Sequence, residues 1–504
     1  MKNKDWLILF FLSLVFLTTR LINLTKLPIF TDEAMYLNWG RLIVKNPKEN
    51  LFISLTDGQQ PFFIWLAGLV YLIGGKTPLL AGRLISVVSG LGTTLVLFFI
   101  GKELLGKKWN IILPALYIIV PFTLWHDRLA IKDSFLMFLA SLLFYFSLKQ
   151  ARFSQMKWPI FADLTLGIAL LTKSIAYFFI GLYIINIIIF TKNYSFSKLK
   201  QIILAFFIAF LIQGIAYLSP LKANIGPKHG VFLLSLVEFF QNPFLLVRNN
   251  LYSTVLWWWQ YYSLLIAPAA LGWLYLFLKN KKLWLLLSLW VALPIGFEIF
   301  MAKIYIPRYF LFTFIAFSIL VGFGVKVFFT KIKSGFFFNR PRMTFCQPRR
   351  FLCLGFFSWS CIALMFPGLL LDYQILFDVE NARLPQIERW QYLEGWPSGY
   401  GVKPLIDFFK KELKNNKVNV IAEEETLIPS SLSLYLSEEP NFKLTKAFKL
   451  DKDLYFPKNY LDEDSQNFIV LNHFKSLPDD WPVEKVPTLP RANGKSEILV
   501  YLVK

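Results

Sequence analysis

The chain has 504 residues, of which 56% are hydrophobic and 18% are aromatic, and its mean hydropathy is +0.51. Soluble proteins contain about 45–50% apolar residues, so this composition predicts a polytopic membrane protein. The formal net charge is +21, but residues 1–371 carry 36 basic and 11 acidic residues, whereas residues 372–504 carry 17 and 21. The basic excess lies mainly in short loops between apolar runs, as the positive-inside rule requires. No basic stripe interleaved with aromatic residues occurs in a polar segment, which excludes nucleic acid as a partner.

Apolar runs that approach the roughly 20 residues needed to cross a bilayer recur along the first part of the chain. We predict about eleven transmembrane helices, with ends that shift by a few residues. They lie at 6–24, 79–101, 109–125, 133–149, 157–172, 174–191, 200–218, 252–278, 283–301, 308–329 and 351–371. Residues 1–371 are therefore expected to form a membrane domain.

Basic residues cluster in alternate loops between these spans. Placing the clusters in the cytoplasm predicts a cytoplasmic N-terminus and an extracytoplasmic region after residue 371, in the plasma or inner membrane. The apolar segment 61–75 has only 15 residues, which is short for a bilayer. If it crossed, the basic loop at 102–108 would face outward. We therefore interpret it as an interfacial or re-entrant helix within a first outer loop at 25–78.

This first outer loop carries two adjacent acidic residues, Asp32 and Glu33, in a membrane domain that is poor in acidic residues. A simple interpretation is a helix start, with Thr31 or Asp32 as the N-cap and Glu33 favouring the helix dipole. The alternative is a functional site, because charged residues near membrane depth are functional candidates by default.

The predicted topology brings further ionisable residues to the same outer face. They are Asp133, Arg83, Lys173, Arg308 and Tyr309. Each has a simpler interpretation. Asp133 can cap the start of its span, Arg83 can extend to the headgroups, and Lys173, Arg308 and Tyr309 can be interfacial anchors.

Residues 372–504 are more polar and are predicted to form a small extracytoplasmic α/β domain. Residues 403–413 have the pattern of an amphipathic helix, and 418–422, 468–471 and 498–503 have that of short buried strands. We find no catalytic motif in this region. The three cysteines, at 346, 353 and 361, lie in or beside the last apolar run and indicate no disulfide framework or metal site.

Carboxylates and cations at the outer membrane surface suit group transfer from a lipid-linked phosphate. The lipid tail stays in the bilayer while the phosphate lies at headgroup depth. Arg and Lys side chains would neutralise charge on the leaving phosphate, and a carboxylate would take the proton of an incoming hydroxyl.

Seven short segments occur in an order that resembles one group of enzymes. They are 31–34 (TDEA), 60–61 (QP), 81–84 (AGRL), 128–133 (RLAIKD), 171–173 (LTK), 307–309 (PRY) and 391–401 (QYLEGWPSGYG). The chain is thereby similar to polyprenyl-phosphate-sugar-dependent glycosyltransferases of the C-type membrane fold. That group includes protein O-mannosyltransferases and aminoarabinose transferases.

The resemblance implies roles for the candidate residues. Asp32 would be the catalytic base or position the acceptor, with Glu33 in support, and Asp133 would lie near acceptor and donor sugar. A second set would hold the donor phosphate: Arg83, Lys173, Arg308 and Tyr309. One departure concerns the acceptor, because aminoarabinose transferases carry a lysine before a proline pair where this chain has Gln60 and a single Pro61.

The sequence thus predicts a membrane glycosyltransferase. It would move a sugar from a polyprenyl-phosphate donor to a hydroxyl of a lipid, glycan or protein acceptor. We predict no bound metal or other cofactor, although a divalent cation stays open because metal dependence varies across this fold. The main alternative is a transporter or flippase of lipid-linked sugars, which should have midplane ionisable residues and repeated halves. A second is a non-catalytic assembly subunit that binds through residues 372–504.

Overall fold

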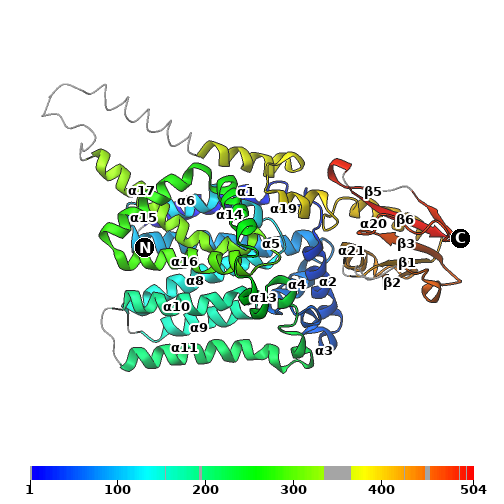
Figure 1. The fold of residues 1–504 in the computed structure, drawn as a ribbon, viewed down its shortest axis with the longest axis horizontal. Coiled ribbons are helices and arrows are strands. Elements are labelled where there is room, and N and C mark those ends of the chain that lie inside the picture. Colours follow the sequence, from blue (N-terminus) through cyan, green and yellow to red (C-terminus); the bar gives the residue numbers. More distant parts are fainter. Residues whose placement is uncertain are drawn as a thin grey trace, which may run out of the picture.

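The computed structural model describes residues 3–504 except 154, 192–195, 334–364, 425, 449–453, 487–488 and 495. Long helices lie side by side in a bundle, and a small sheet lies at the end of the bundle opposite to the N-terminus (Figure 1). We call this the domain-facing end. The helices α2 and α4 of the predicted first outer loop also lie there.

The helical part of the chain contains long apolar helices joined by shorter ones. In chain order they are α1 (Asn3–Leu21), α2 (Thr31–Lys45), α3 (Pro47–Asn50), α4 (Phe62–Gly74), α5 (Pro78–Leu104), α6 (Ile112–Ile119), α7 (Pro121–His126), α8 (Lys132–Arg152), α9 (Lys157–Leu170), α10 (Tyr177–Phe190), α11 (Phe196–Gly214), α12 (His229–Phe232), α13 (Leu236–Gln241), α14 (Val247–Tyr262), α15 (Ile266–Lys279), α16 (Lys281–Met301) and α17 (Phe314–Lys333). Short 3-10 turns include η1 (Ile53–Asp57), η2 (Ser174–Ala176) and η6 (Pro307–Thr313).

Within the described residues, five helical stretches are long and apolar enough to cross a membrane. They are Pro78–Leu104, Lys132–Arg152, Val247–Lys279, Lys281–Met301 and Pro307–Thr330. Apolar helices of 10–17 residues accompany them, among them Phe62–Gly74, Ser174–Phe190 and Met365–Phe377. The membrane-helical class is therefore confirmed, whereas the predicted number of eleven spans is not established. The last predicted span lies outside the described residues up to 364, as do the three cysteines.

Two predicted spans contain a break in the helical backbone. The span at 109–125 is interrupted between α6 and α7, where Val120 has an extended backbone with ψ 125. The physical reason is Pro121, because the residue before a proline is pushed out of the helical region. The span at 252–278 is interrupted between α14 and α15 at Ser263, whose φ is 46. Neither interruption could be read from hydropathy alone.

The predicted interfacial segment forms α4, which has 13 residues. At a rise of about 1.5 Å per residue it is about 20 Å long, shorter than the hydrocarbon core of a bilayer. It packs against α2 at a close crossing, where a Cβ added to Gly40 would lie 2.7 Å from the backbone nitrogen of Gly68. This length and packing agree with the expected non-spanning helix, and its orientation to a membrane stays a prediction.

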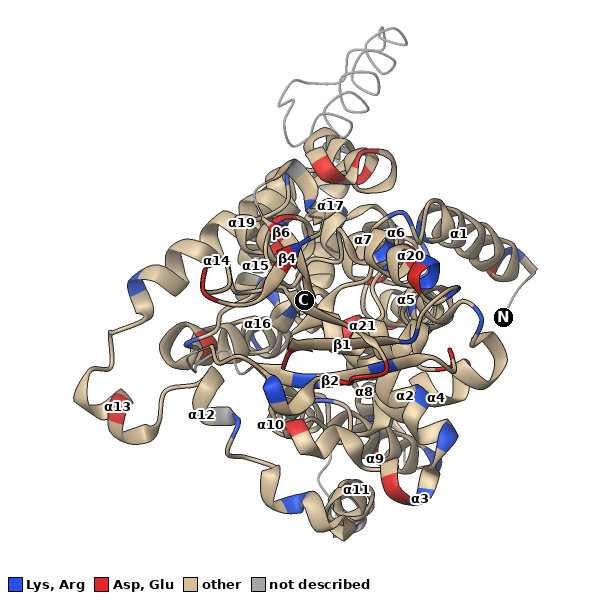
Figure 2. Cartoon of the chain, turned by 90° about the vertical axis from the view of Figure 1, so that its right-hand side faces the viewer, with Lys and Arg blue, Asp and Glu red and all other residues tan. Residues whose placement is uncertain are grey.

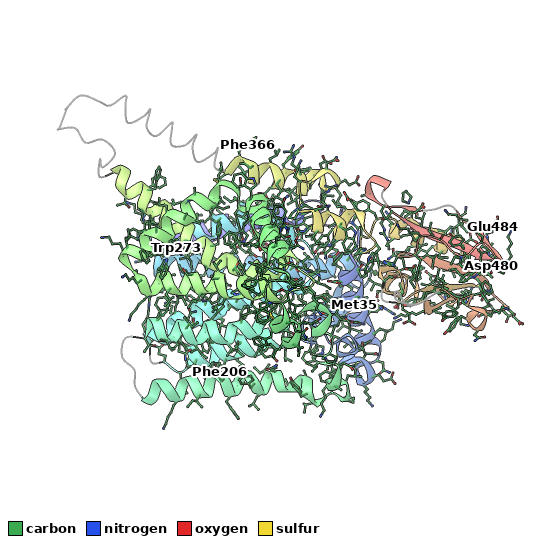
Figure 3. The ribbon with its side chains drawn as sticks, viewed as in Figure 1. Met35, Phe206, Trp273, Phe366, Asp480 and Glu484 are labelled. Carbon is green, nitrogen blue, oxygen red and sulfur yellow. The ribbon has the colours of Figure 1, made fainter. Side chains whose placement is uncertain are left out.

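Large apolar side chains are exposed on the outside of the bundle. Examples are Phe10 on α1, Val88 on α5 and Phe207 on α11, each at least 60% exposed. In Figure 3 the labelled Trp273 and Phe366 lie on the helical part, whereas Asp480 and Glu484 lie at the far end of the sheet. Broad apolar exposure on a folded protein marks a membrane or protein contact surface, so the surface of the bundle is that of a membrane protein.

The region after 371 contains the predicted α/β domain. Its helices are α19 (Gln386–Arg389), α20 (Val402–Glu412) and α21 (Leu427–Leu436), and its strands are β1 (Val418–Glu423), β2 (Phe442–Phe448), β3 (Gln466–Leu471), β4 (Val483–Lys485), β5 (Leu489–Pro490) and β6 (Glu497–Val503). The strand order is β2-β1-β3-β6-β4, with β5 paired to β6, and β1 is parallel to both β2 and β3. The predicted helix at 403–413 and all three predicted strands are confirmed.

The domain and the bundle share one apolar core. Buried residues of α20 and α21 belong to the same contiguous cluster as those of the bundle, whereas Ile421 and Ile469 face a second, smaller cluster across the sheet. α21 packs directly against α2. Seen from the sheet, β1 and β2 lie in front of α2, α4 and α8 (Figure 2). The domain boundary at 371 stays a prediction.

Candidate active site

The first turn of α2 carries both acidic residues of the predicted pair. Phe30 is the N-cap, so Thr31, Asp32 and Glu33 all lie inside the helix. Asp32 Oδ2 accepts a hydrogen bond of 2.8 Å from Arg308 Nη2. The Asp32 side chain is 23% exposed and the Arg308 side chain is 11% exposed. Asp32 therefore keeps part of its exposure and, besides its place in the first turn, forms an ion pair with a residue far away in the chain.

Arg308 lies in η6 and has aromatic neighbours as well as an acidic one. Its guanidinium carbon lies 5.5 Å from the centre of the Phe30 ring, and its Nη1 lies 3.5 Å from the hydroxyl of Tyr392. Its Nε is buried and has no hydrogen-bond partner among the described residues. A buried donor without a partner calls for an explanation. It leaves Arg308 able to donate to an additional anionic group.

A second ion pair joins Asp133 in the first turn of α8 to Lys173 in the turn before η2. Lys173 Nζ donates to Asp133 Oδ1 at 2.6 Å and lies 4.5 Å from the centre of the Tyr309 ring. Burial lowers the pKa of the Lys173 ammonium, and the Asp133 carboxylate opposes that shift. Asp133, Lys173 and Tyr309, which are far apart in sequence, therefore meet at one place.

Tyr36 shows that the two ion pairs are neighbours. Burial raises the pKa of this phenol well above its ordinary value, and the charges of Asp32 and Asp133 raise it further. Its hydroxyl donates to Gln59 Oε1 at 3.1 Å. The open cluster, as we call it, consists of Asp32, Asp133, Lys173, Arg308, Tyr309 and Tyr36 together with Lys132.

Lys132 is a member of the open cluster that the sequence analysis did not select. Its Nζ donates to Gln59 Oε1 at 2.7 Å and to the carbonyl oxygen of Gln60 at 3.3 Å, and lies 4.9 Å from the centre of the Tyr36 ring. No carboxylate lies within ion-pair distance of it among the described residues. Lys132 could have been selected from the sequence by its position next to Asp133, since a lysine at the start of a membrane helix is costly.

Glu33 and Arg83 lie in a different environment, which we call the closed cluster. Arg83 Nε and Nη2 each donate to the Glu33 carboxylate at 2.8 Å, and both side chains are fully buried. The carboxylate also accepts from the backbone nitrogens of Phe30 and Ala130 at 2.9 and 2.6 Å. Arg83 donates its remaining hydrogens to the carbonyls of Leu24, Leu27 and Pro28.

This environment does not suit the roles predicted for the closed cluster. Every hydrogen-bonding group of the pair faces protein, and the pair ties the start of α2, α5, the loop before α2 and the loop before α8 together. The structure thus gives Arg83 and Glu33 no exposed group with which to meet a donor phosphate or an acceptor. We therefore propose a supporting role for this pair.

His126 lies in a buried position behind the open cluster. Its Nδ1 is 2.8 Å from the carbonyl oxygen of Phe122, and its Nε2 is 3.2 Å from Glu388 Oε1. Glu388 also accepts from the hydroxyl of Tyr261. Among the described residues, no group of three or more His, Cys, Asp or Glu side chains could hold a metal ion.

The open cluster combines two carboxylates, the partly exposed Asp32 and the buried Asp133, with three basic side chains. A carboxylate in such surroundings can accept a proton from a hydroxyl. Arg and Lys donors can stabilise negative charge as it develops on a leaving group. The arrangement can therefore support the transfer of a group from an anionic donor to a hydroxyl.

Sequence comparison identifies a family over part of the chain. Residues 58–217 match the family model described as dolichyl-phosphate-mannose-protein mannosyltransferase. The match includes Lys132, Asp133 and Lys173, and it begins after Asp32 and ends before Arg308. No curated protein matches the chain.

Structural comparison extends the likeness to the whole chain. The fold is similar to that of ArnT from Cupriavidus metallidurans bound to undecaprenyl phosphate, with a TM-score of 0.61 and 13% identity, covering 99% of this chain and 98% of that chain. It is similar to the apo oligosaccharyltransferase of Archaeoglobus fulgidus, with a TM-score of 0.55 and 12% identity, covering 92% of this chain and 69% of that one. It is also similar to mycobacterial arabinofuranosyltransferase AftD, with a TM-score of 0.50 and 12% identity, covering 100% of this chain and 40% of that one.

The family match and the fold together confirm the predicted resemblance. Residues 58–217 match a mannosyltransferase family, and the chain as a whole has the C-type membrane fold of polyprenyl-phosphate-sugar-dependent glycosyltransferases. The solved structures are only 12–13% identical to this chain and therefore show its fold alone.

Proposed function

We propose that the chain transfers one sugar from a polyprenyl-phosphate donor to a hydroxyl of a lipid, glycan or protein acceptor on the extracytoplasmic side of a plasma or inner membrane. The observation that carries the proposal is the open cluster, in which the accessible Asp32–Arg308 pair lies beside Asp133, Lys173 and Lys132. It lies at the domain-facing end, where the predicted topology places the outer surface. The similar fold of ArnT bound to undecaprenyl phosphate supports a lipid-phosphate donor.

In the proposed reaction Asp32 takes the proton of the acceptor hydroxyl. The acceptor oxygen then attacks the anomeric carbon, and the bond between that carbon and the phosphate oxygen breaks with inversion relative to the donor. The polyprenyl phosphate leaves with its electron pair. Its charge is stabilised by Arg308, whose Nε is a spare donor, and by Lys173 and Lys132.

Binding of the donor phosphate would also release Asp32 from its ion pair with Arg308. Arg308 now donates to Asp32 Oδ2 and so occupies the oxygen that would accept the proton. A phosphate that accepts from Arg308 would compete for the guanidinium and leave Asp32 free for the acceptor proton. Asp133 would keep Lys173 oriented and lie near the acceptor and the donor sugar.

The test is release of polyprenyl phosphate by the purified full-length protein. A panel of polyprenyl-phosphate sugars would be supplied with crude membrane acceptors. We expect release by the wild type and a loss of about a hundredfold or more in Asp32→Asn, the size of a missing general base. Asp407→Asn, an exposed aspartate on α20, is the control and should retain full activity.

Two results would contradict the proposal. Equal release by wild type and Asp32→Asn would show that Asp32 is not the base. Absence of release with every donor, combined with transport of the same lipids across liposome membranes, would favour the transporter alternative.

A further inference from the structure

The C-terminal domain reaches the first turn of α2 through a short segment. The carbonyl oxygen of Pro397 accepts two hydrogen bonds from Thr31, one from the backbone nitrogen at 3.1 Å and one from Oγ1 at 2.8 Å. Thr31 immediately precedes Asp32. The backbone groups at the start of a helix have no partner within the helix, and here one of them is satisfied by a residue more than 360 positions away.

Gly399 allows this contact. A Cβ added at Gly399 would lie 1.9 Å from the carbonyl oxygen of Ile29, so the two backbones are in direct contact. Any side chain at this position must displace either the segment or the residues that lead into α2. The close approach therefore fixes the distance between the domain and the helix that carries Asp32.

The same segment also supports Arg308. Tyr392, which is fully buried in η8 (Trp390–Glu394), packs its ring 4.5 Å from that of Phe30 and 5.3 Å from that of Trp125. Its hydroxyl is the group that lies 3.5 Å from Arg308 Nη1. Arg308, and Thr31 directly before Asp32, thus both contact residues that follow position 390.

The segment is anchored to the sheet by a buried arginine. Arg491 Nη1 donates to the carbonyl oxygens of Ser398 and Tyr400, and its Nη2 donates to Asn472 Oδ1. Asn472 in turn donates from Nδ2 to the carbonyl oxygen of Trp396 at 3.0 Å. Arg491 is 3% exposed. A buried cation that binds neutral carbonyls in this way holds a loop in one conformation.

Asn472, the partner of Arg491, is itself bound at the end of strand β1. The buried carboxylate of Glu423, at the end of β1, accepts hydrogen bonds from the backbone nitrogens of Asn472, His473 and Phe474 at 3.0, 2.7 and 2.8 Å. A continuous series of hydrogen bonds therefore runs from β1 through Asn472 and Arg491 to the segment and on to Thr31.

From this series we infer that the C-terminal domain is part of the active site. Segment 392–401, held by Arg491, sets the positions of Asp32 and Arg308, so that Tyr392, Gly399 and Arg491 are positioning residues for the transfer reaction. The inference rests on the proposed function. It assigns the domain a role in the chemical step, whereas a domain that only covers the site or only binds acceptor would not need to hold the catalytic helix.

The test compares Thr31→Val with Thr31→Ser in the full-length protein. Valine keeps the shape of threonine and removes the hydroxyl that donates to Pro397, whereas serine keeps it. We expect Thr31→Val to lower kcat about two- to tenfold, the range of one hydrogen bond. The KM for the polyprenyl-phosphate sugar and the melting temperature should stay unchanged, and Thr31→Ser should restore kcat. Thr56→Val is the matched control, since Thr56 is exposed and bonds only within its own turn.

Gly399→Ala is the stronger variant. Because a displacement of about 1 Å at a reacting group can cost a hundredfold in rate, we expect a loss of kcat of about ten- to a hundredfold. Gly181→Ala is its control, since a Cβ at Gly181 would meet no atom within 4 Å. If Gly399→Ala does not fold, the Thr31 variants decide the question.

The outcomes separate the inference from the proposed function. Normal kcat in Thr31→Val, with an active wild type, would overturn the inference and leave the transferase intact. A parallel loss of kcat and melting temperature that Thr31→Ser does not restore would also overturn it, because the contact would then be merely structural. An Asp32→Asn enzyme as active as the wild type would overturn the proposed function itself.

Discussion

The open and the closed cluster contain adjacent acidic residues in opposite environments. Asp32 forms a partly exposed pair with Arg308, and a donor on Arg308 has no partner in the described part of the chain. Glu33 forms a fully buried pair with Arg83, and its carboxylate accepts four hydrogen bonds. The accessible pair can exchange a protein partner for a ligand. The saturated pair cannot do so without leaving buried charges uncompensated.

Helix geometry produces this division. Successive residues of an α-helix point about 100° apart, since one turn contains about 3.6 residues. Once α2 packs against α4 and α21, one of the two side chains must face the interior and the other the domain-facing end. Two carboxylates that look equivalent in the sequence thereby acquire different tasks.

The largest effect should come from the closed cluster. Glu33→Gln removes the charge that compensates Arg83 in a fully buried site. The free energy of unfolding should therefore fall by about 3–5 kcal/mol, measured by thermal unfolding of the purified protein. The double variant Glu33→Gln with Arg83→Met should recover part of the loss, because no buried charge remains. A Glu33→Gln protein of normal stability and no activity would instead return Glu33 to the catalytic role that the sequence predicted.

The next largest effect is expected in the open cluster, where a substitution should lower activity and leave stability unchanged. Asp32→Asn should lower kcat about a hundredfold, while the melting temperature stays close to that of the wild type because the side chain is partly exposed. Release of polyprenyl phosphate and thermal unfolding, measured on the same preparation, check both parts. A large loss of stability in Asp32→Asn would show that Asp32, like Glu33, is needed for the stability of the fold.

Lys173 should make the rate depend on alkaline pH. Burial lowers its pKa, so this cation becomes neutral at a lower pH than an ordinary lysine, whose pKa is about 10.4. As pH rises through the lowered pKa, the charge that stabilises the leaving phosphate is lost and kcat should fall. In Lys173→Arg this alkaline decline should move to higher pH, since arginine stays protonated. Lys443→Arg, in an exposed pair with Asp462, is the control, and an unchanged profile in Lys173→Arg would exclude Lys173 as the titrating group.

The smallest effect is expected for Lys132. Lys132→Gln removes a cation that has no carboxylate within ion-pair distance among the described residues, so no anion is left unpaired and stability should change little. The kcat/KM for the donor should fall about tenfold, the size of a lost hydrogen bond to a charged group, because Lys132 is proposed to stabilise the leaving phosphate. Steady-state kinetics over a range of donor concentrations measure kcat/KM. An unchanged kcat/KM would restrict Lys132 to packing against Tyr36 and Gln59.

Parts of the fold with strong local patterns could be predicted from the sequence. The helix α20 and the strands β1, β3 and β6 agree with their predicted ranges because alternation and helical periodicity record which face is buried. The short α4 was separated from the spans by its length and by the positions of basic loops. Breaks at Pro121 and Ser263 were missed, because they depend on backbone conformation, to which hydropathy is insensitive.

The sequence by itself predicted a membrane-embedded helical glycosyltransferase with Asp32, Asp133, Lys173, Arg308 and Tyr309 as candidates for one site, because composition, charge distribution and motif order are properties of the chain. Only the tertiary structure decided that Glu33 and Arg83 form a fully buried pair, that Lys132 lies against Tyr36 of the open cluster, and that residues 392–401 contact the start of α2. These are contacts between segments far apart in the chain. Burial, partner choice and close backbone approach arise only when such segments pack together.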